Sequence, residues 1–155
     1  MHTGMLHLHS ILRWIVLLVA LWAIIKMASG RSGNKPFTAA DTRPALLFMI
    51  FMDIQLLVGL VLYFIGPWGI KNIQAQGMGG VMKDSIGRFF AVEHTIGMLL
   101  ALIFVHIGYA ATKKAVDDKA KFNKAFRFFL AALIIILISI PWPFRESLNR
   151  GWMPG

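Results

Sequence analysis

Six ionisable side chains lie inside or at the edge of long apolar segments, and they are the residues of this chain whose types could support chemistry. They are His9, Arg13, Asp53, Glu93, His94 and His106. Three of them fall in one run, FFAVEHTIGMLLALIFVHIGYAAT at residues 89–112, which is long enough to cross a bilayer. An ionisable residue at that depth costs roughly 2.5–3.5 kcal/mol on insertion scales, so each one needs a partner or a function.

Imidazole is the group in this set with the clearest cofactor chemistry. Haem in a helical bundle is held by side chains that project inward from facing helices, and a six-coordinate electron-transfer haem needs two axial ligands. The chain has five His and no Cys. The absence of cysteine excludes disulfides, thiolate metal sites and covalent c-type attachment, so a haem held here would be haem b. The competing interpretation is that these residues make polar contacts between packed helices.

The elements that must position these residues are membrane helices. The chain is 57% hydrophobic and 15% charged with a mean hydropathy of +0.67, which is far more apolar than a soluble domain. Four continuous apolar runs predict spans at about residues 5–26, 45–65, 89–112 and 126–140. We therefore expect an all-α, single-domain, four-helix transmembrane bundle. Pro44 suits the first turn of the second helix, and the long connection at residues 66–88 has room for a short surface helix.

Charge predicts the orientation of this bundle. The net charge of +9 comes from Lys and Arg between the apolar runs, where topology signals lie, so it does not indicate a nucleic-acid partner. The first and third connections hold ten Lys and Arg residues, against five in the second connection and the C-terminal tail. The positive-inside rule then places both termini on the outer, periplasmic side. Trp142 and Trp152 in the tail are expected at the membrane surface.

Depth in the membrane pairs two of the histidines. The first and third helices both run inward from the outer side, and His9 and His94 lie a few residues below their starts, at comparable depth. His7 lies about 200° away from His9 around the helix, on a face that continues through Trp14 and looks lipid-facing. Arg13 shares the His9 face and is placed to meet a haem propionate or Glu93. We therefore choose His9 and His94 as the ligand pair, although His7 remains an alternative to His9.

The residues around His94 have expected supporting roles. Gly97 lies near the same side of the helix and would let another backbone or a flat macrocycle approach. Glu93 and Thr95 are candidates for orienting a ligating imidazole through a hydrogen bond, although Glu93 is expected to reach a neighbouring helix. An ion pair between Glu93 and Arg13 is the favoured structural alternative for those two residues.

His106 is expected to have a different partner. It lies 12 residues beyond His94, about 18 Å deeper and rotated by about 120°, so it cannot bind the same iron. A second haem at His106 is disfavoured because no further His is available there. Asp53 enters from the cytoplasmic side to a similar depth, and a hydrogen bond between the two is preferred.

Three short motifs carry a family resemblance. HLHSILRW at residues 7–14, RFFAVEHTIGM at 88–98 and HIGY at 106–109 resemble small bacterial four-helix membrane proteins labelled cytochrome b, and more loosely the cytochrome b561-like and copper-resistance membrane proteins. The resemblance implies a b-type haem protein of the bacterial cytoplasmic (inner) membrane with His9 and His94 as ligands. The second pair of bundle histidines that a two-haem electron wire requires is missing.

The sequence hypothesis is a multi-pass protein with one haem b near the outer face, working in electron transfer or redox sensing rather than as a self-contained enzyme. A quinone or another redox protein would have to complete the electron path. The alternative is a non-redox transporter or accessory subunit with a polar network of Arg13, Asp53, Glu93 and His106. A third possibility is metal handling by His2, His7 and His9. The sequence leaves open the oligomeric state, a homo-oligomer included, and the electron donor and acceptor.

Overall fold

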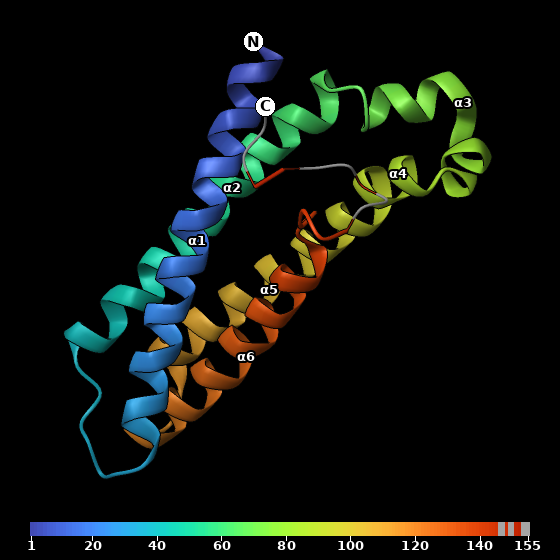
Figure 1. Cartoon of the computed structure of the whole chain (residues 1–155). Coiled ribbons are helices and arrows are strands. Elements are labelled where there is room, and N and C mark those ends of the chain that lie inside the picture. The colour runs from blue at the N-terminus through green and yellow to red at the C-terminus, as the bar shows by residue number, and fades with distance from the viewer. Residues whose placement is uncertain (146–147, 149–150, 153–155) are drawn as a thin grey trace.

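The computed structural model of the chain describes residues 1–145, 148 and 151–152, and this part is helical with no strand. Figure 1 shows the arrangement of its helices. In chain order they are α1 (His2–Arg31), α2 (Ala39–Ile65), α3 (Ile70–Lys83), α4 (Ser85–Arg88), the π turn η1 (Phe89–Glu93), α5 (His94–Lys114) and α6 (Asp118–Ser139).

Four of these segments are long and apolar enough to cross a membrane. They are α1, α2, the continuous helical stretch Ser85–Lys114, and α6. By length and composition the chain is therefore a multi-pass membrane protein, as the sequence predicts. Large apolar side chains point outward along these helices, with Leu18, Leu57 and Ile138 each at least 60% exposed. An outward apolar surface of this kind is what a helix needs in contact with lipid.

The inner surface of the bundle is built from aromatic and small side chains. α1 packs beside α2, and α5 packs beside α6 (Figure 1). Phe48 of α2 and Phe129 of α6 meet with ring centroids 5.4 Å apart, and both are fully buried. Fully buried alanines, including Ala20, Ala23 and Ala101, let the helices approach one another around these rings.

Two helices begin earlier than the hydropathy pattern predicts, because their first turns are polar and capped. α2 begins at Ala39 rather than residue 45, where Asp41 Oδ2 accepts a hydrogen bond from Thr38 N at 3.0 Å. Pro44 therefore lies inside the helix and not in its first turn. α6 begins at Asp118 rather than residue 126, because the Asp117 side chain accepts from Ala120 N at 2.7 Å. Most of the basic connection expected at residues 113–127 is therefore the start of α6.

The two ends of the bundle differ in character. One end, which we call the termini end, carries residue 1, the connection between α2 and α4 that contains α3, and residues 140–145 (Figure 1). The loop end carries the two short connections, residues 32–38 and 115–117. α3 is the short helix that the sequence leaves room for, and it extends across the termini end between α2 and α4 (green in Figure 1). Trp142 and Trp152 pack against Trp14 of α1 at the same end.

Candidate functional site

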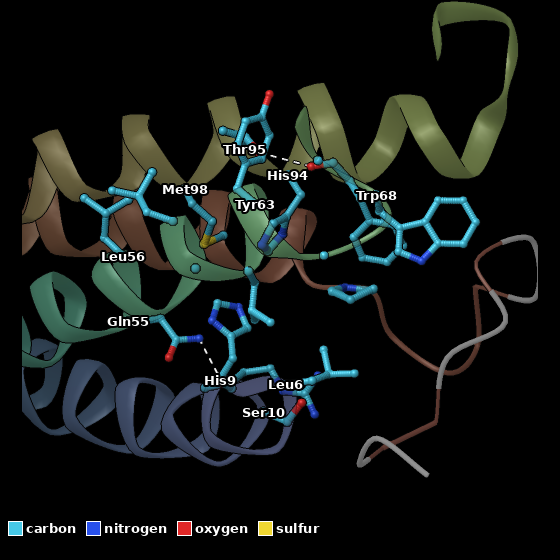
Figure 2. Close-up of a pocket in the computed structure, with 18 of the residues that line it drawn as sticks. Leu6, His9, Ser10, Gln55, Leu56, Tyr63, Trp68, His94, Thr95 and Met98 are labelled. Carbon is cyan, nitrogen blue, oxygen red and sulfur yellow. Dashed lines mark hydrogen bonds between the residues drawn. The ribbon is translucent and has the colours of Figure 1, made fainter. Parts of the chain in front are cut away.

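His9 of α1 and His94 of α5 face one another near the termini end of the bundle. Their ring centroids are 6.1 Å apart and their planes cross at 70°. In Figure 2 the two rings point toward each other from opposite helices. Both rings line one cavity of about 210 Å³. The structure therefore brings together the two histidines that the depth argument pairs, and His7 does not line this cavity.

The walls of the cavity are mainly apolar. They come from α1, α2, α5 and α6, and from the segment that follows α2. The side chains include Leu56, Leu60, Tyr63, Trp68, Met98 and Ile136. Apolar walls with a few convergent polar groups are typical of a cofactor or small-molecule site.

His94 is oriented by the end of α6. Its Nδ1 lies 2.8 Å from the Ser139 carbonyl oxygen, so Nδ1 carries the proton and donates it. The other nitrogen, Nε2, keeps its lone pair. This is the arrangement found for metal-binding histidines, whose second nitrogen donates to a carbonyl or carboxylate.

The Ser139 carbonyl is available because of the prolines that follow it. In a continuous helix the Ser139 and Leu137 carbonyls would accept from residues 143 and 141, which are both prolines without an N–H. Each carbonyl finds a side-chain donor instead: His94 Nδ1 for Ser139, and Trp142 Nε1 at 2.7 Å for Leu137.

A π turn immediately precedes His94. η1 covers Phe89–Glu93, and Thr95 Oγ1 donates to the Phe90 carbonyl at 3.1 Å within the same widened turn. π turns inside α-helices occur frequently at functional sites. Thr95 therefore donates to the backbone of its own helix. It does not orient the His94 ring, which is the role that the sequence suggests for it.

His9 is positioned by α2. A Cβ placed on Gly59 would lie 3.3 Å from His9 Cε1 and 3.7 Å from Nδ1, so the missing side chain makes room for this edge of the ring. Gln55 Nε2 donates to the His9 carbonyl at 3.0 Å. His9 Nδ1 and Gln55 Oε1 are buried and have no hydrogen-bond partner within the described residues. Unpaired buried polar atoms call for an explanation, and a bound ligand is one.

Arg13 lines the same cavity and is held by the tail. Its Nη2 donates to the Trp152 carbonyl, while Nε is buried without a partner in the described part of the chain. Trp14 packs against the rings of Trp142 and Trp152 at centroid distances of 6.2 and 6.3 Å. Trp14 thus lies on the exposed face of α1, as expected, and the two tail tryptophans pack against its ring.

The expected partner of Glu93 is not found, and Gly97 serves the approach of another helix rather than of a macrocycle. Glu93 forms an ion pair with Arg88 at 2.7 Å on the same helical stretch, so it neither pairs with Arg13 nor reaches another helix. Gly97 does not line the cavity. It faces α6, where an added Cβ would lie 2.1 Å from Ser139 Oγ. Gly97 thus allows α6 to approach closely enough for Ser139 to meet His94.

His106 and Asp53 form a separate contact on the outside of the bundle. His106 Nε2 lies 2.8 Å from Asp53 Oδ1, which is the pairing that the depth argument favours. Their side chains are 45% and 41% exposed, and neither lines the cavity. The structure therefore separates this pair from the His9 and His94 site.

Three imidazoles line the cavity, those of His2, His9 and His94. The part of the chain that the structure describes contains no group of three or more His, Asp or Glu side chains able to hold a metal ion. His2, His7 and His9 accordingly do not gather into the N-terminal chelating site considered above.

Sequence reasoning missed three residues that set the site: Ser139, Gly59 and Gln55. The Pro141 and Pro143 pair was the available signal for Ser139, because it predicts free carbonyls in the preceding turn. Gly59 had no such signal. No family model, curated protein or solved structure matches this chain. The site itself offers two opposed imidazoles and an arginine in an apolar cavity.

Proposed function

We propose that this chain is a membrane-bound b-type haem protein that works in electron transfer or redox sensing, with one haem in the cavity between His9 and His94. The observation that carries the proposal is the 6.1 Å separation of the two ring centroids. Two imidazoles that bind one iron from opposite faces, each at a metal–nitrogen distance of about 2 Å, have centroids about 6 Å apart.

The state of each imidazole supports this ligand pair. His94 donates through Nδ1 to Ser139, which leaves Nε2 as the ligating atom and fixes the ring. His9 has its Nδ1 edge against Gly59, and α1 is tied to α2 through the Gln55 hydrogen bond to the His9 carbonyl. The His94 ring and the backbone at His9 are therefore held before any ligand binds, which reduces the entropy lost on binding.

The rest of the cavity suits an apolar macrocycle with acidic substituents. Tyr63, Trp68 and Met98 line the cavity and offer flat or flexible apolar surface to a macrocycle. Arg13 offers an uncompensated guanidinium to a propionate, because no carboxylate in the described residues pairs with it. When bound, the haem would supply one-electron oxidation and reduction of its iron.

Charge distribution supports an orientation for this site. With ten Lys and Arg residues in the first and third connections and five at the other side, we place the termini end outside and the loop end in the cytoplasm. The haem would then lie near the outer face of a bacterial cytoplasmic membrane. One haem near one face does not cross the membrane, so a quinone or a redox protein partner is required.

The transporter alternative has weaker support, because its polar residues do not connect. Glu93 is paired with Arg88, His106 with Asp53, and Arg13 with the tail. A proton or ion path needs such groups in one chain across the membrane.

The decisive experiment is an optical spectrum of the purified protein after expression with haem supplementation. The proposal predicts Soret and α bands of a reduced low-spin haem in the wild type. His9→Ala and His94→Ala should each remove the low-spin signal. His7→Ala and Met98→Leu are the controls and should retain it. A colourless wild-type protein that stays folded, or a low-spin spectrum that survives His94→Ala, would refute the proposal.

A further inference from the structure

A second hollow lies between α5 and α6 at the loop end, far from the histidine cavity. It has a volume of about 540 Å³. Part of its lining is apolar or small: Ile107, Ala110 and Ala111 from α5 and Phe128 from α6. The two helices lie side by side down to this end of the bundle (Figure 1).

Three cations also line this groove, and we call them the rim cations: Lys114, Lys124 and Arg127. Helical spacing gathers them. Ile107, Ala111 and Lys114 follow one face of α5 at intervals of four and three residues, and Lys124, Arg127 and Phe128 share a face of α6. The alanines leave the groove open, because longer side chains at those positions would fill it.

The rim cations have no acidic partner. Within residues 1–145, 148 and 151–152, none of the three makes an ion pair or a side-chain hydrogen bond. The neighbouring Lys121, in contrast, pairs with Asp118 at 2.9 Å. Three positive charges therefore converge on one groove without compensation, which favours an anionic occupant.

The position of the groove selects a lipid as that occupant. Lys114 is the last residue of its spanning helix, and Arg127 lies nine residues inside α6, so the groove opens on the membrane-spanning part of both helices. Ile107 lies seven residues before Lys114, about 10 Å deeper in the membrane. The groove thus presents cations and apolar side chains together near the end of the spanning helices, where a lipid headgroup and the start of its acyl chains lie.

We propose that this groove is a binding site for an anionic phospholipid, with the phosphate held by Lys114, Lys124 and Arg127 and an acyl chain along Ile107, Ala110, Ala111 and Phe128. Basic pockets between transmembrane helices bind acidic headgroups by this combination of charge and apolar surface. The site is independent of the haem, because no residue of the groove lines the histidine cavity.

The test is lipid binding to the delipidated full-length protein in a non-ionic detergent, followed by native mass spectrometry and thermal unfolding. Phosphatidylglycerol should bind and raise the unfolding temperature, whereas phosphatidylcholine should bind far more weakly. In the triple variant Lys114→Gln, Lys124→Gln and Arg127→Gln, affinity should fall by about a hundredfold. The matched control neutralises Lys26, Arg43 and Lys119 at the same end of the bundle and should bind close to wild type.

A second variant tests the apolar half without altering charge. Ala111→Phe should fill the groove and weaken phosphatidylglycerol binding while the rim cations remain, so the test stands if the triple variant does not fold. Equal weakening in the triple variant and its control, or equal affinity for phosphatidylcholine, would overturn the proposal. An equal effect of inorganic phosphate alone would also overturn it, because the acyl chain would then contribute nothing.

Discussion

His94 Nδ1 lies 2.8 Å from the carbonyl oxygen of Ser139. The last residue of α6 therefore fixes the imidazole ring of the first residue of α5. This contact depends on two sequence features on different helices. Pro143 leaves the Ser139 carbonyl without a backbone donor, and Gly97 lets α6 come close enough to reach the ring. The orientation of His94, the proposed iron ligand, thus depends on Pro143 and Gly97, which do not line the cavity.

Gly97→Ala should therefore disturb the position of His94, although Gly97 does not line the histidine cavity. The added Cβ would overlap Ser139 Oγ and crowd Ser139 Cβ, so the Ser139 side chain or the end of α6 must shift beside His94. We expect a loss of about 1–3 kcal/mol in the free energy of unfolding, as for other overpacked sites, and a lower haem content. Thermal unfolding and the ratio of Soret to protein absorbance measure both.

The control for this substitution is Gly4→Ala, because nothing lies within 4 Å of a Cβ at Gly4. Adding Ser139→Ala to Gly97→Ala removes the Oγ atom and should restore part of the stability. If Gly97→Ala unfolds at the wild-type temperature with full haem content, the close approach of α6 is not what orients His94.

Gly59→Leu tests the position of His9 in the same way. A Cβ at Gly59 is already 3.3 Å from His9 Cε1, so a leucine must displace the ring. The low-spin signal should be lost while the helix content by circular dichroism stays unchanged. Gly59→Ala is the graded control and should retain most of the haem. Retention of the low-spin spectrum in Gly59→Leu would exclude His9 as the ligand.

Helical rise and chain direction explain which contacts the sequence could predict. The facing of His9 and His94, and the pairing of Asp53 with His106, follow from depth in the membrane together with rotation around each helix. The partner of Glu93 could not be predicted, because a π turn brings residues five apart onto one face and the sequence did not reveal that turn. The capped polar starts of α2 and α6 were missed because hydropathy registers only the apolar part of a helix.

The Asp53 and His106 contact should stabilise the bundle without affecting the haem. Asp53→Leu or His106→Leu alone leaves the other polar side chain unpaired in an apolar setting. We expect each to lower the free energy of unfolding by about 1–3 kcal/mol. The double substitution Asp53→Leu and His106→Leu should recover most of that loss, because replacing both partners of a pair is often neutral. Unfolding in lipid nanodiscs measures the three variants. A changed haem spectrum in His106→Leu would instead make His106 a ligand.

Arg13→Gln should lower the reduction potential of the proposed haem. The guanidinium lines the cavity and makes no ion pair among the described residues, so its positive charge favours the reduced iron, which carries one positive charge fewer. Removing that charge should lower the midpoint potential on the order of tens of millivolts. A spectroscopic redox titration measures the shift, and Lys83→Gln, which removes a charge at the same end of the bundle but outside the cavity, is the control. An equal potential in wild type and Arg13→Gln would show that Arg13 serves only to hold the tail through the Trp152 carbonyl.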